Sequence, residues 1–340
     1  MSTLVVIIVK RGARISRKGS TLCISKPVSV EDEKDSKKYQ FITENIPLID
    51  IEMLVVIGSN VRISSGSMLM LAEANIPIIV HSRRLDVVLL TPYNVRIAEA
   101  RRRLYRLADN IKWRIHIGKI LIEGKLLGFA NVIRYLAYKD IEKGKNIKWV
   151  LKEIHDINRL RKAEASNLRS IEDLRLYEAK WSKKLWELFV TFTPSEYEFT
   201  GRDPRSKDPI NSAISYAYAI IYGLCTHALI ASGLDPYVGI IHSERAGRTS
   251  LTYDFSEMFK PIVIHAIAIA SRIARLNVDK NGYLTKKSLE TVTRLIYRVL
   301  RRKHRGWKYT VRGEIYAKAW ELRQNIEKGT VFKPFIYSIK

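Results

Sequence analysis

The sequence is poor in cysteine and in acidic residues, and it has no long uninterrupted apolar run. Its 340 residues include two cysteines, Cys23 and Cys225, and neither belongs to a CxxC pair or a cysteine–histidine cluster. This excludes a disulfide scaffold and an obvious zinc finger, and it is typical of a reducing cytoplasm. No apolar run approaches the ~18–20 residues of a spanning helix, and the run at 4–9 is too short for a secretory signal. We therefore expect a cytoplasmic protein with no membrane insertion.

The shortage of acidic residues leaves a large positive charge. The chain has 59 Lys and Arg against 34 Asp and Glu, which gives a net charge of +25 and a pI near 10. Apolar residues at 46% and charged residues at 27% are ordinary for a globular protein and argue against disorder. The charge predicts a polyanionic partner, either nucleic acid or an anionic membrane surface.

The charge and the hydrophobic pattern both change near residue 95. Residues 1–95 hold 12 basic and 9 acidic residues, whereas residues 96–340 hold 47 and 25. The first part has short Val- and Ile-rich runs broken by Gly, Ser and Pro, which predict strands. We expect strands at 4–9, 21–25, 53–57 and 78–81, one helix at 65–74 and a solvated loop at 30–39.

The second part has helical periodicity throughout. Helices are expected at 96–137, 144–164, 167–190, 210–232, 254–276, 286–303 and 312–327. The sequence therefore predicts an α+β protein with a small β-rich N-terminal domain at 1–91 and a larger all-α domain at 92–340.

One helical stripe contains a carboxylate where an apolar residue is expected. Glu178 shares a spacing of three and four residues with large apolar side chains, whereas Glu172 and Asp173 fall off the stripe. The stripe comprises Ile171, Leu174, Glu178, Trp181, Leu185 and Leu188. A carboxylate on a buried face costs several kcal/mol unless it is paired or binds a metal. The pattern leaves both a buried Glu–Arg or Glu–Lys pair and a metal ligand open.

A second set of polar residues follows the helix expected at 210–232. Gly233 and the Asp235-Pro236 pair end that helix, and a short extended segment leads to His242. A new helix is expected from about Asp254, which shares a face with Glu257. These two acids could instead form a capping box, and a lone histidine is more often structural than a ligand.

Together these residues offer an imidazole and two or three carboxylates within a basic domain. Oxygen ligands with one imidazole suit Mg²⁺ or Mn²⁺. Such an ion can polarise a phosphate and neutralise developing charge, while Lys and Arg hold a nucleic-acid backbone.

Two sequence blocks carry a resemblance to a known family. The segments Asp208–Ala219 and Gly233–Ser243 resemble the CRISPR-associated adaptation integrases, the Cas-one family. The segments 46–51 and 71–78 look like the family's N-terminal domain, and Thr91-Pro92 looks like its domain junction. The resemblance covers almost the whole chain and implies an N-terminal β domain and a helical domain with a metal site.

The resemblance implies a ligand set and an activity. Its first ligand corresponds to Glu178, its second to His242 and its third to Glu257, with Asp254 as a supporting or alternative ligand. It implies metal-dependent DNA cleavage and strand transfer, in which the 3′-hydroxyl of a short captured segment attacks the CRISPR repeat. It also implies a homodimer and a small Cas-two partner subunit, and the small, nearly neutral domain is the natural surface for dimerisation.

Basic residues near the expected site are candidate contacts to double-stranded or splayed-end DNA. Arg245 and Arg248 flank Gly247 just after His242. A denser run with interleaved aromatic residues contains Arg298, Arg301, Arg302, Lys303 and Arg305. A solvated helix face with Trp307 in the core is the alternative for that run.

Two other functions remain open from the sequence. A non-catalytic nucleic-acid scaffold would keep the fold and basic surface, but it would gain nothing from Glu178 on an apolar stripe. A metal-dependent RNA nuclease would use the same metal chemistry, because phosphate contacts do not distinguish the sugar.

Overall fold

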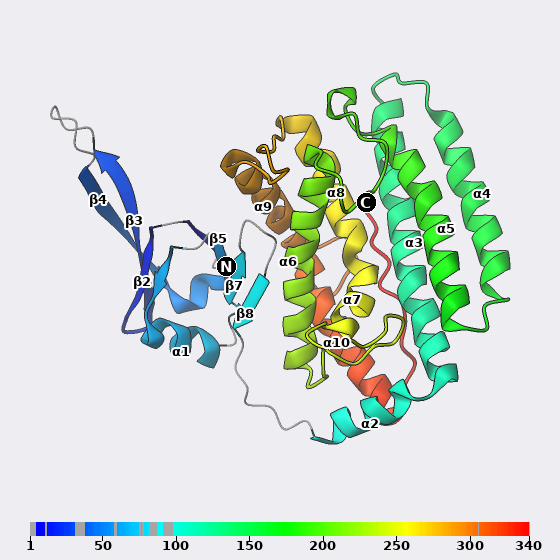
Figure 1. The fold of residues 1–340 in the computed structure, drawn as a ribbon, viewed down its shortest axis with the longest axis horizontal. Helices are drawn as coiled ribbons and strands as arrows, with labels where there is room; N and C mark the ends of the chain where they lie inside the picture. Colours follow the sequence, from blue (N-terminus) through cyan, green and yellow to red (C-terminus); the bar gives the residue numbers. More distant parts are fainter. Residues whose placement is uncertain are drawn as a thin grey trace. The chain divides into compact units, whose positions relative to one another are not determined.

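A computed structural model describes residues 5–10, 12–30, 38–57, 60–74, 76, 78–81, 87–90, 98–304 and 306–339. Contacts divide the chain into two compact units, residues 1–94 and 95–340. Strands dominate the first unit and helices the second, which confirms the predicted α+β class (Figure 1).

The described residues of the N-terminal unit form two four-stranded sheets. Their strands are β1 (Val5–Lys10), β2 (Arg14–Lys18), β3 (Thr21–Val30), β4 (Lys38–Pro47), β5 (Ile51–Ile57), β6 (Arg62–Ile63), β7 (Ile78–His81) and β8 (Val87–Leu90). One sheet has the order β1-β5-β7-β8 and the other β4-β3-β2-β6. The first is parallel from β1 to β7, and its central strand has three consecutive buried residues, Leu54, Val55 and Val56. Burial on both faces explains the unbroken apolar run there.

The strands expected from apolar runs correspond to β1, β3, β5 and β7. Strands β2, β4, β6 and β8 were not expected. Strand β4 pairs with the whole length of β3, yet residues 40–45 are exposed and lack an apolar face. Most of the loop expected at 30–39 lies outside the described residues, and its ends belong to β3 and β4.

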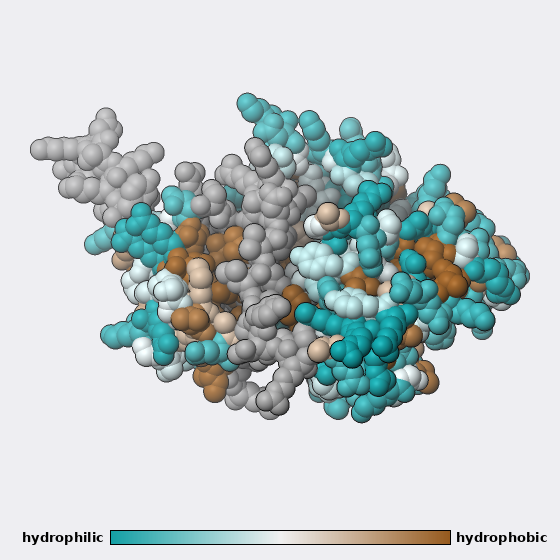
Figure 2. Space-filling model, turned by 60° about the horizontal axis from the view of Figure 1, so that its bottom comes forward, coloured by the Kyte–Doolittle hydropathy of each residue, from teal (hydrophilic) through white to brown (hydrophobic). Residues whose placement is uncertain are grey.

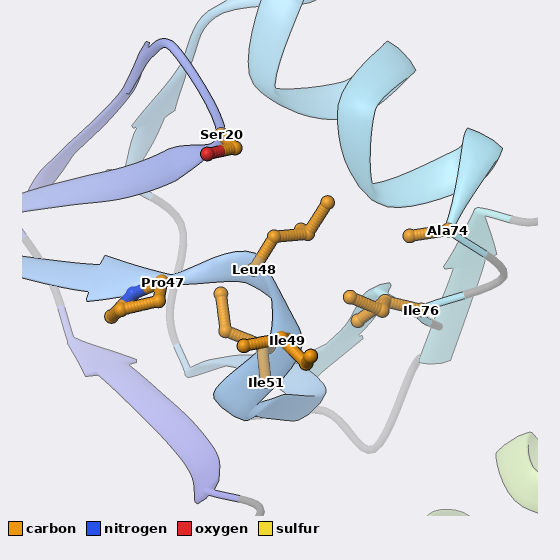
Figure 3. A pocket seen from close by; sticks show the side chains of 7 residues that line it. All are labelled: Ser20, Pro47, Leu48, Ile49, Ile51, Ala74 and Ile76. Carbon is orange, nitrogen blue, oxygen red and sulfur yellow. The ribbon is translucent and has the colours of Figure 1, made fainter.

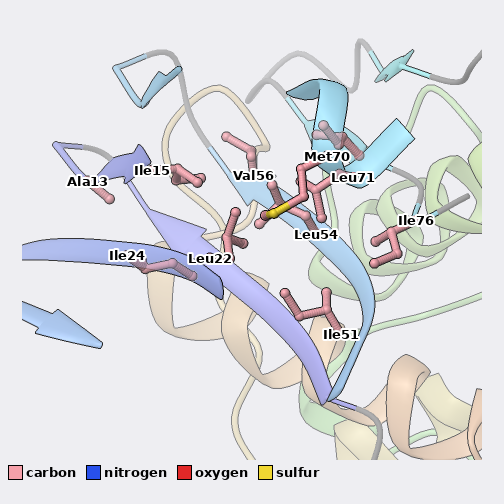
Figure 4. Packing of buried hydrophobic residues seen from close by; sticks show 11 residues of the cluster. Ala13, Ile15, Leu22, Ile24, Ile51, Leu54, Val56, Met70, Leu71 and Ile76 are labelled. Atoms are coloured by element: carbon pink, nitrogen blue, oxygen red, sulfur yellow. The ribbon is translucent and has the colours of Figure 1, made fainter. Parts of the chain in front are cut away.

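A compact apolar core holds the N-terminal unit together (Figure 4). Leu22 and Ile24 from β3 meet Leu54 from β5 and Leu71 from helix α1 (Ser65–Glu73). The Ser64 hydroxyl accepts a hydrogen bond from the amide of Ser67 and so caps α1. The helix expected at 65–74 is confirmed.

A mainly apolar cavity of about 440 Å³ opens at the end of β4 in the same unit (Figure 3). Its lining residues are Ser20, Pro47, Leu48, Ile49, Ile51, Ala74 and Ile76. Of these residues, Ile49 is 78% exposed, so the lining presents an apolar side chain to solvent.

The second unit is built from helices. They are α2 (Ala98–Ala108), α3 (Ile111–Ile141), α4 (Lys148–Ala165), α5 (Ile171–Val190), α6 (Pro209–Ala231), α7 (Ser250–Ser256), α8 (Lys260–Ile273), α9 (Lys286–Leu300) and α10 (Val311–Lys328). Helices α3, α4 and α5 lie side by side, and α6 packs against α7, α8, α9 and α10 (Figure 1).

The observed helices begin and end within a few residues of the expected bounds, except at two of the expected helices. The stretch expected at 96–137 divides into α2 and α3, because Asn110 Oδ1 accepts hydrogen bonds from the amides of Lys112 and Trp113 and starts a new helix. The helix expected from about Asp254 begins earlier, at Ser250, and a 3₁₀ turn, η3 (Glu257–Phe259), separates α7 from α8. The expected start was therefore wrong.

Helix α6 corrects the expectation that no segment is apolar enough to span a membrane. Among the described helices it alone has the necessary length and hydropathy, but 78% of its apolar window is buried within the fold. Helix α6 is therefore a core helix, because most of its apolar surface is covered by the rest of the protein.

Candidate metal and nucleic-acid site

Helix α5 places Glu178 on its buried face, as the stripe predicts. Ser170 and Asp173 form a capping box that fixes the start of the helix. The stripe residues Leu174, Trp181, Leu185 and Leu188 are buried. The Glu178 side chain is 27% exposed, whereas that of Glu172 is 67% exposed. The structure therefore distinguishes the two acids in the predicted way.

Glu178 forms a buried ion pair with Lys125 from α3. Its Oε1 accepts hydrogen bonds from Lys125 Nζ and, at 2.7 Å, from the Ser182 hydroxyl. Burial opposes ionisation, but the positive charge of Lys125 outweighs it and lowers the pKa of Glu178. The buried Glu–Lys pair that the sequence left open is thus present.

Glu257 in η3 shares the same lysine. Its Oε2 lies 2.8 Å from Lys125 Nζ, and its Oε1 accepts a hydrogen bond of 2.5 Å from Lys260 Nζ. The Oε2 atom is buried and has no partner with hydrogen-bond geometry. Burial opposes ionisation here too, but Lys125 and Lys260 outweigh it and lower the pKa of Glu257 to about 2. Both glutamates are therefore carboxylates at neutral pH.

Asp254 holds the backbone that presents His242. Asp254 is fully buried, and its oxygens accept hydrogen bonds from the amides of Ile240, Ile241 and His242 at 2.7, 2.9 and 3.1 Å. Its Oδ1 also lies 2.5 Å from His242 Nδ1. Asp254 is inside α7, so the capping-box alternative is wrong. A hydrogen bond at Nδ1 fixes the imidazole and leaves Nε2 as its metal-binding nitrogen.

The segment before His242 is also anchored to the helices that carry Lys125 and Glu178. Arg114 of α3 donates a hydrogen bond of 2.9 Å to the carbonyl of Ile240. Arg175 of α5 donates one of 2.7 Å to the carbonyl of Ile241. A Cβ at Gly118 would lie 2.7 Å from Leu174 Cδ1 and 3.2 Å from Ile241 Cγ1, so these three elements are in close contact.

The predicted ligands meet in part. Glu178 and Glu257 converge on one ammonium group. His242 does not join them: its ring lies 6.2 Å from that of Tyr253, which in turn lies 4.8 Å from the ring of Tyr222. Among the described residues, no three His, Cys, Asp or Glu side chains are close enough to hold a metal ion.

The donor chemistry nevertheless fits a divalent cation. Two ionised carboxylates already hold a cation, the ammonium of Lys125, and the buried Oε2 of Glu257 lies 2.8 Å from it. Carboxylate oxygens and one imidazole suit Mg²⁺ or Mn²⁺. Glu178 and Glu257 could hold such an ion from one side, and His242 Nε2 could complete the set after a local adjustment.

Neither lysine of the site was expected from the sequence. Lys125 is 9% exposed within an apolar stretch of α3 and follows Gly124. The local sequence offers one indication that Lys125 is buried, namely its position after glycine and before apolar residues of the helix. Lys260 lies against Tyr218, whose ring centroid is 5.3 Å away, and burial raises the pKa of Tyr218 to about 12.

Asn211 supports a loop. Its side chain accepts hydrogen bonds from Arg202 and the amide of Asp203, and it donates to Asp208 and the carbonyl of Gly201. This network ties residues 201–208 to the start of α6.

The predicted DNA contacts lie in two places. Arg245 is exposed in the loop after His242, and the guanidinium of Arg248 lies 5.2 Å from the ring of Tyr253, beside His242. The second run begins at the end of α9 with the sequence-predicted residues Arg298, Arg301, Arg302 and Lys303, while Arg305 lies outside the described residues. Trp307 packs against Phe335 at 5.3 Å, which favours the core alternative for this ring.

Comparison with known proteins shows that the chain is similar to one protein family. The model of the family described as CRISPR associated protein Cas1 matches residues 6–298. The CRISPR-associated endonuclease Cas1 of Hyperthermus butylicus is 31% identical over 305 residues, which cover 84% of this chain and 88% of that protein. A second Cas1 endonuclease, from Pyrobaculum aerophilum, is 26% identical over 284 residues, which cover 83% of this chain and 87% of that protein.

Solved structures share the fold. A casposase bound to an integration product has a TM-score of 0.77 at 18% identity, covering 97% of this chain and 92% of that chain. A Cas1 protein from Thermotoga maritima has a TM-score of 0.73 at 18% identity, with coverage of 96% and 98%. A chain of a Cas6–RT–Cas1–Cas2 complex matches with a TM-score of 0.70 at 17% identity. The match covers 100% of this chain and 37% of that chain.

Proposed function

This chain belongs to the CRISPR-associated Cas1 family of endonucleases, and from that premise we propose that it is a metal-dependent DNA endonuclease and integrase. Its reaction would join a short DNA segment to a CRISPR array by transesterification at a phosphodiester. The observation that carries the proposal is the pair of ionised carboxylates, Glu178 and Glu257, that converge on one cation.

The proposed site uses three ligands. Glu178 and Glu257 would hold Mg²⁺ or Mn²⁺, and His242 would add its Nε2 while Asp254 fixes the ring through Nδ1. When bound, the ion would supply Lewis-acid polarisation of the phosphodiester and neutralise developing charge. Arg248, beside Tyr253 and His242, is placed to hold a phosphate near these ligands.

Loss of Glu178 tests this function. Wild type should nick or join a labelled DNA substrate carrying a CRISPR repeat in Mn²⁺ or Mg²⁺ but not in EDTA. Glu178→Ala should lose both activities by more than about a hundredfold, since even groups that only orient a metal ligand contribute 10–100-fold. It should still bind DNA in a filter assay.

Glu172→Ala is the matched control, because Glu172 is on the same helix but faces solvent. Its activity should equal that of wild type. Full activity of Glu178→Ala, or activity of wild type in EDTA, would refute the metal assignment. Equal cleavage of RNA would favour the RNA nuclease, and binding without any cleavage would favour a scaffold.

DNA, a second copy of this chain and a Cas2 subunit are the proposed partners. The Cas6–RT–Cas1–Cas2 complex supports the Cas2 proposal, because a Cas1 with the fold of this chain is assembled there with Cas2. The N-terminal unit supports dimerisation with exposed apolar side chains, since Ile42 is 62% and Ile49 is 78% exposed. Sedimentation of the full chain with and without Ile49→Asp tests the dimer.

A further inference from the structure

Lys125 lies between the two carboxylates that would hold a divalent cation. Its Nζ contacts Glu178 Oε1 and lies 2.8 Å from Glu257 Oε2. Lys260, the other lysine that contacts this pair, contacts Glu257 alone. Among the described residues, Lys125 is therefore the cation that bridges both glutamates.

The packing of α3 holds this bridge in place. A Cβ at Gly124 would lie 2.8 Å from Met258 Cγ and 2.6 Å from the carbonyl oxygen of Phe335, so glycine lets α3 approach η3 closely. Lys125 follows directly, and its side chain is 11% exposed. Two carboxylates this close would repel each other without a cation between them.

We propose that Lys125 is an internal counter-cation that holds Glu178 and Glu257 in the metal-free protein and must leave them when a divalent cation binds. This inference rests on the proposed metal site. A metal ion would use the oxygens that now contact the ammonium, and an ammonium beside that ion would be repelled. The lysine therefore lowers metal affinity while it stabilises the empty site.

The experiment compares Mn²⁺ binding by wild type, Lys125→Met and Lys125→Gln, with free Mn²⁺ counted by electron paramagnetic resonance. Loss of the competing charge should tighten binding at least tenfold in both variants. Their melting temperatures should fall in EDTA and recover in Mn²⁺ more than that of wild type. Lys125→Gln keeps a hydrogen-bond donor for the carboxylates, so it tests the inference if Lys125→Met fails to fold.

Lys180→Met is the matched control, because Lys180 makes a half-exposed pair with Glu164 on α4. Its Mn²⁺ affinity should equal that of wild type. Equal or weaker Mn²⁺ binding by both Lys125 variants overturns this inference alone. No Mn²⁺ binding by any of the proteins overturns the metal site and this inference together.

Discussion

Asp254 illustrates how one buried residue can determine the position of another. Its carboxylate is fully buried. It accepts hydrogen bonds from three backbone amides and lies 2.5 Å from Nδ1 of His242. Asp254→Asn should lower the free energy of unfolding by about 2–4 kcal/mol, because an amide group offers one acceptor oxygen and sets its NH₂ against backbone donors. Urea denaturation followed by circular dichroism measures this loss.

Glu172→Gln provides the comparison for Asp254→Asn. Glu172 makes an exposed contact of 3.6 Å with Arg175, and such pairs contribute about 0–1 kcal/mol. Its unfolding midpoint should stay close to that of wild type. A stable Asp254→Asn protein would show that the loop before His242 is held by Arg114 and Arg175 without the carboxylate.

At this scale the sequence identifies acids better than their partners. Glu178 could be singled out because a carboxylate on a regular apolar stripe violates the pattern, and the stripe is defined by local periodicity alone. Lys125 lies 53 residues earlier and meets Glu178 only through packing of α3 against α5. No local spacing encodes that contact, so it could not be predicted.

At the scale of a helix, the glycines of α3 set how closely it packs. Alanine normally favours a helix interior over glycine by about 1 kcal/mol. A Cβ at Gly124, however, would lie 2.6 Å from the carbonyl oxygen of Phe335, which is backbone and cannot rotate away. Gly124→Ala should therefore destabilise the protein by about 1–3 kcal/mol, the usual cost of overpacking. Thermal unfolding of the full chain measures the effect.

Gly118→Ala is the matched substitution on the same helix. Its Cβ would meet the end of the Leu174 side chain at 2.7 Å, and such an end can change rotamer. Gly118→Ala should consequently destabilise the protein less than Gly124→Ala does. The reverse order would show that the segment containing Phe335 yields more easily than Leu174.

The element bounds show where local signals suffice. Helices with strong periodicity and caps, such as α5 and α9, were expected within a few residues of their observed bounds. The division between α2 and α3 depends on a single capping side chain, Asn110, in a sequence that is helical on both sides. Strand β4 depends on its pairing with β3, a non-local contact that its exposed residues, with no buried apolar face, do not predict.

At the scale of the whole molecule, charge determines how nucleic acid is held. Nearly all of the net charge of +25 belongs to residues 96–340, and the visible face of the helical unit is largely hydrophilic (Figure 2). If Arg298 and Lys303 each neutralise one phosphate, Arg298→Ala/Lys303→Ala should reduce the slope of log affinity against log salt by about 1.8, since each contact contributes about 0.9 on duplex DNA. Fluorescence anisotropy with a labelled duplex at several salt concentrations gives the slope.

Lys152→Ala/Lys162→Ala removes the same charge from exposed positions on α4. A pure effect of net charge would lower affinity similarly in both double variants, whereas direct phosphate contacts at the end of α9 would change the slope in the first variant alone. Phosphate contacts position the duplex without reading its sequence, so the loss should be uniform across DNA sequences. An unchanged slope in Arg298→Ala/Lys303→Ala would place this run on a solvated surface. Arg245 and Arg248, which follow His242 in the sequence and precede α7, would then be the next to test.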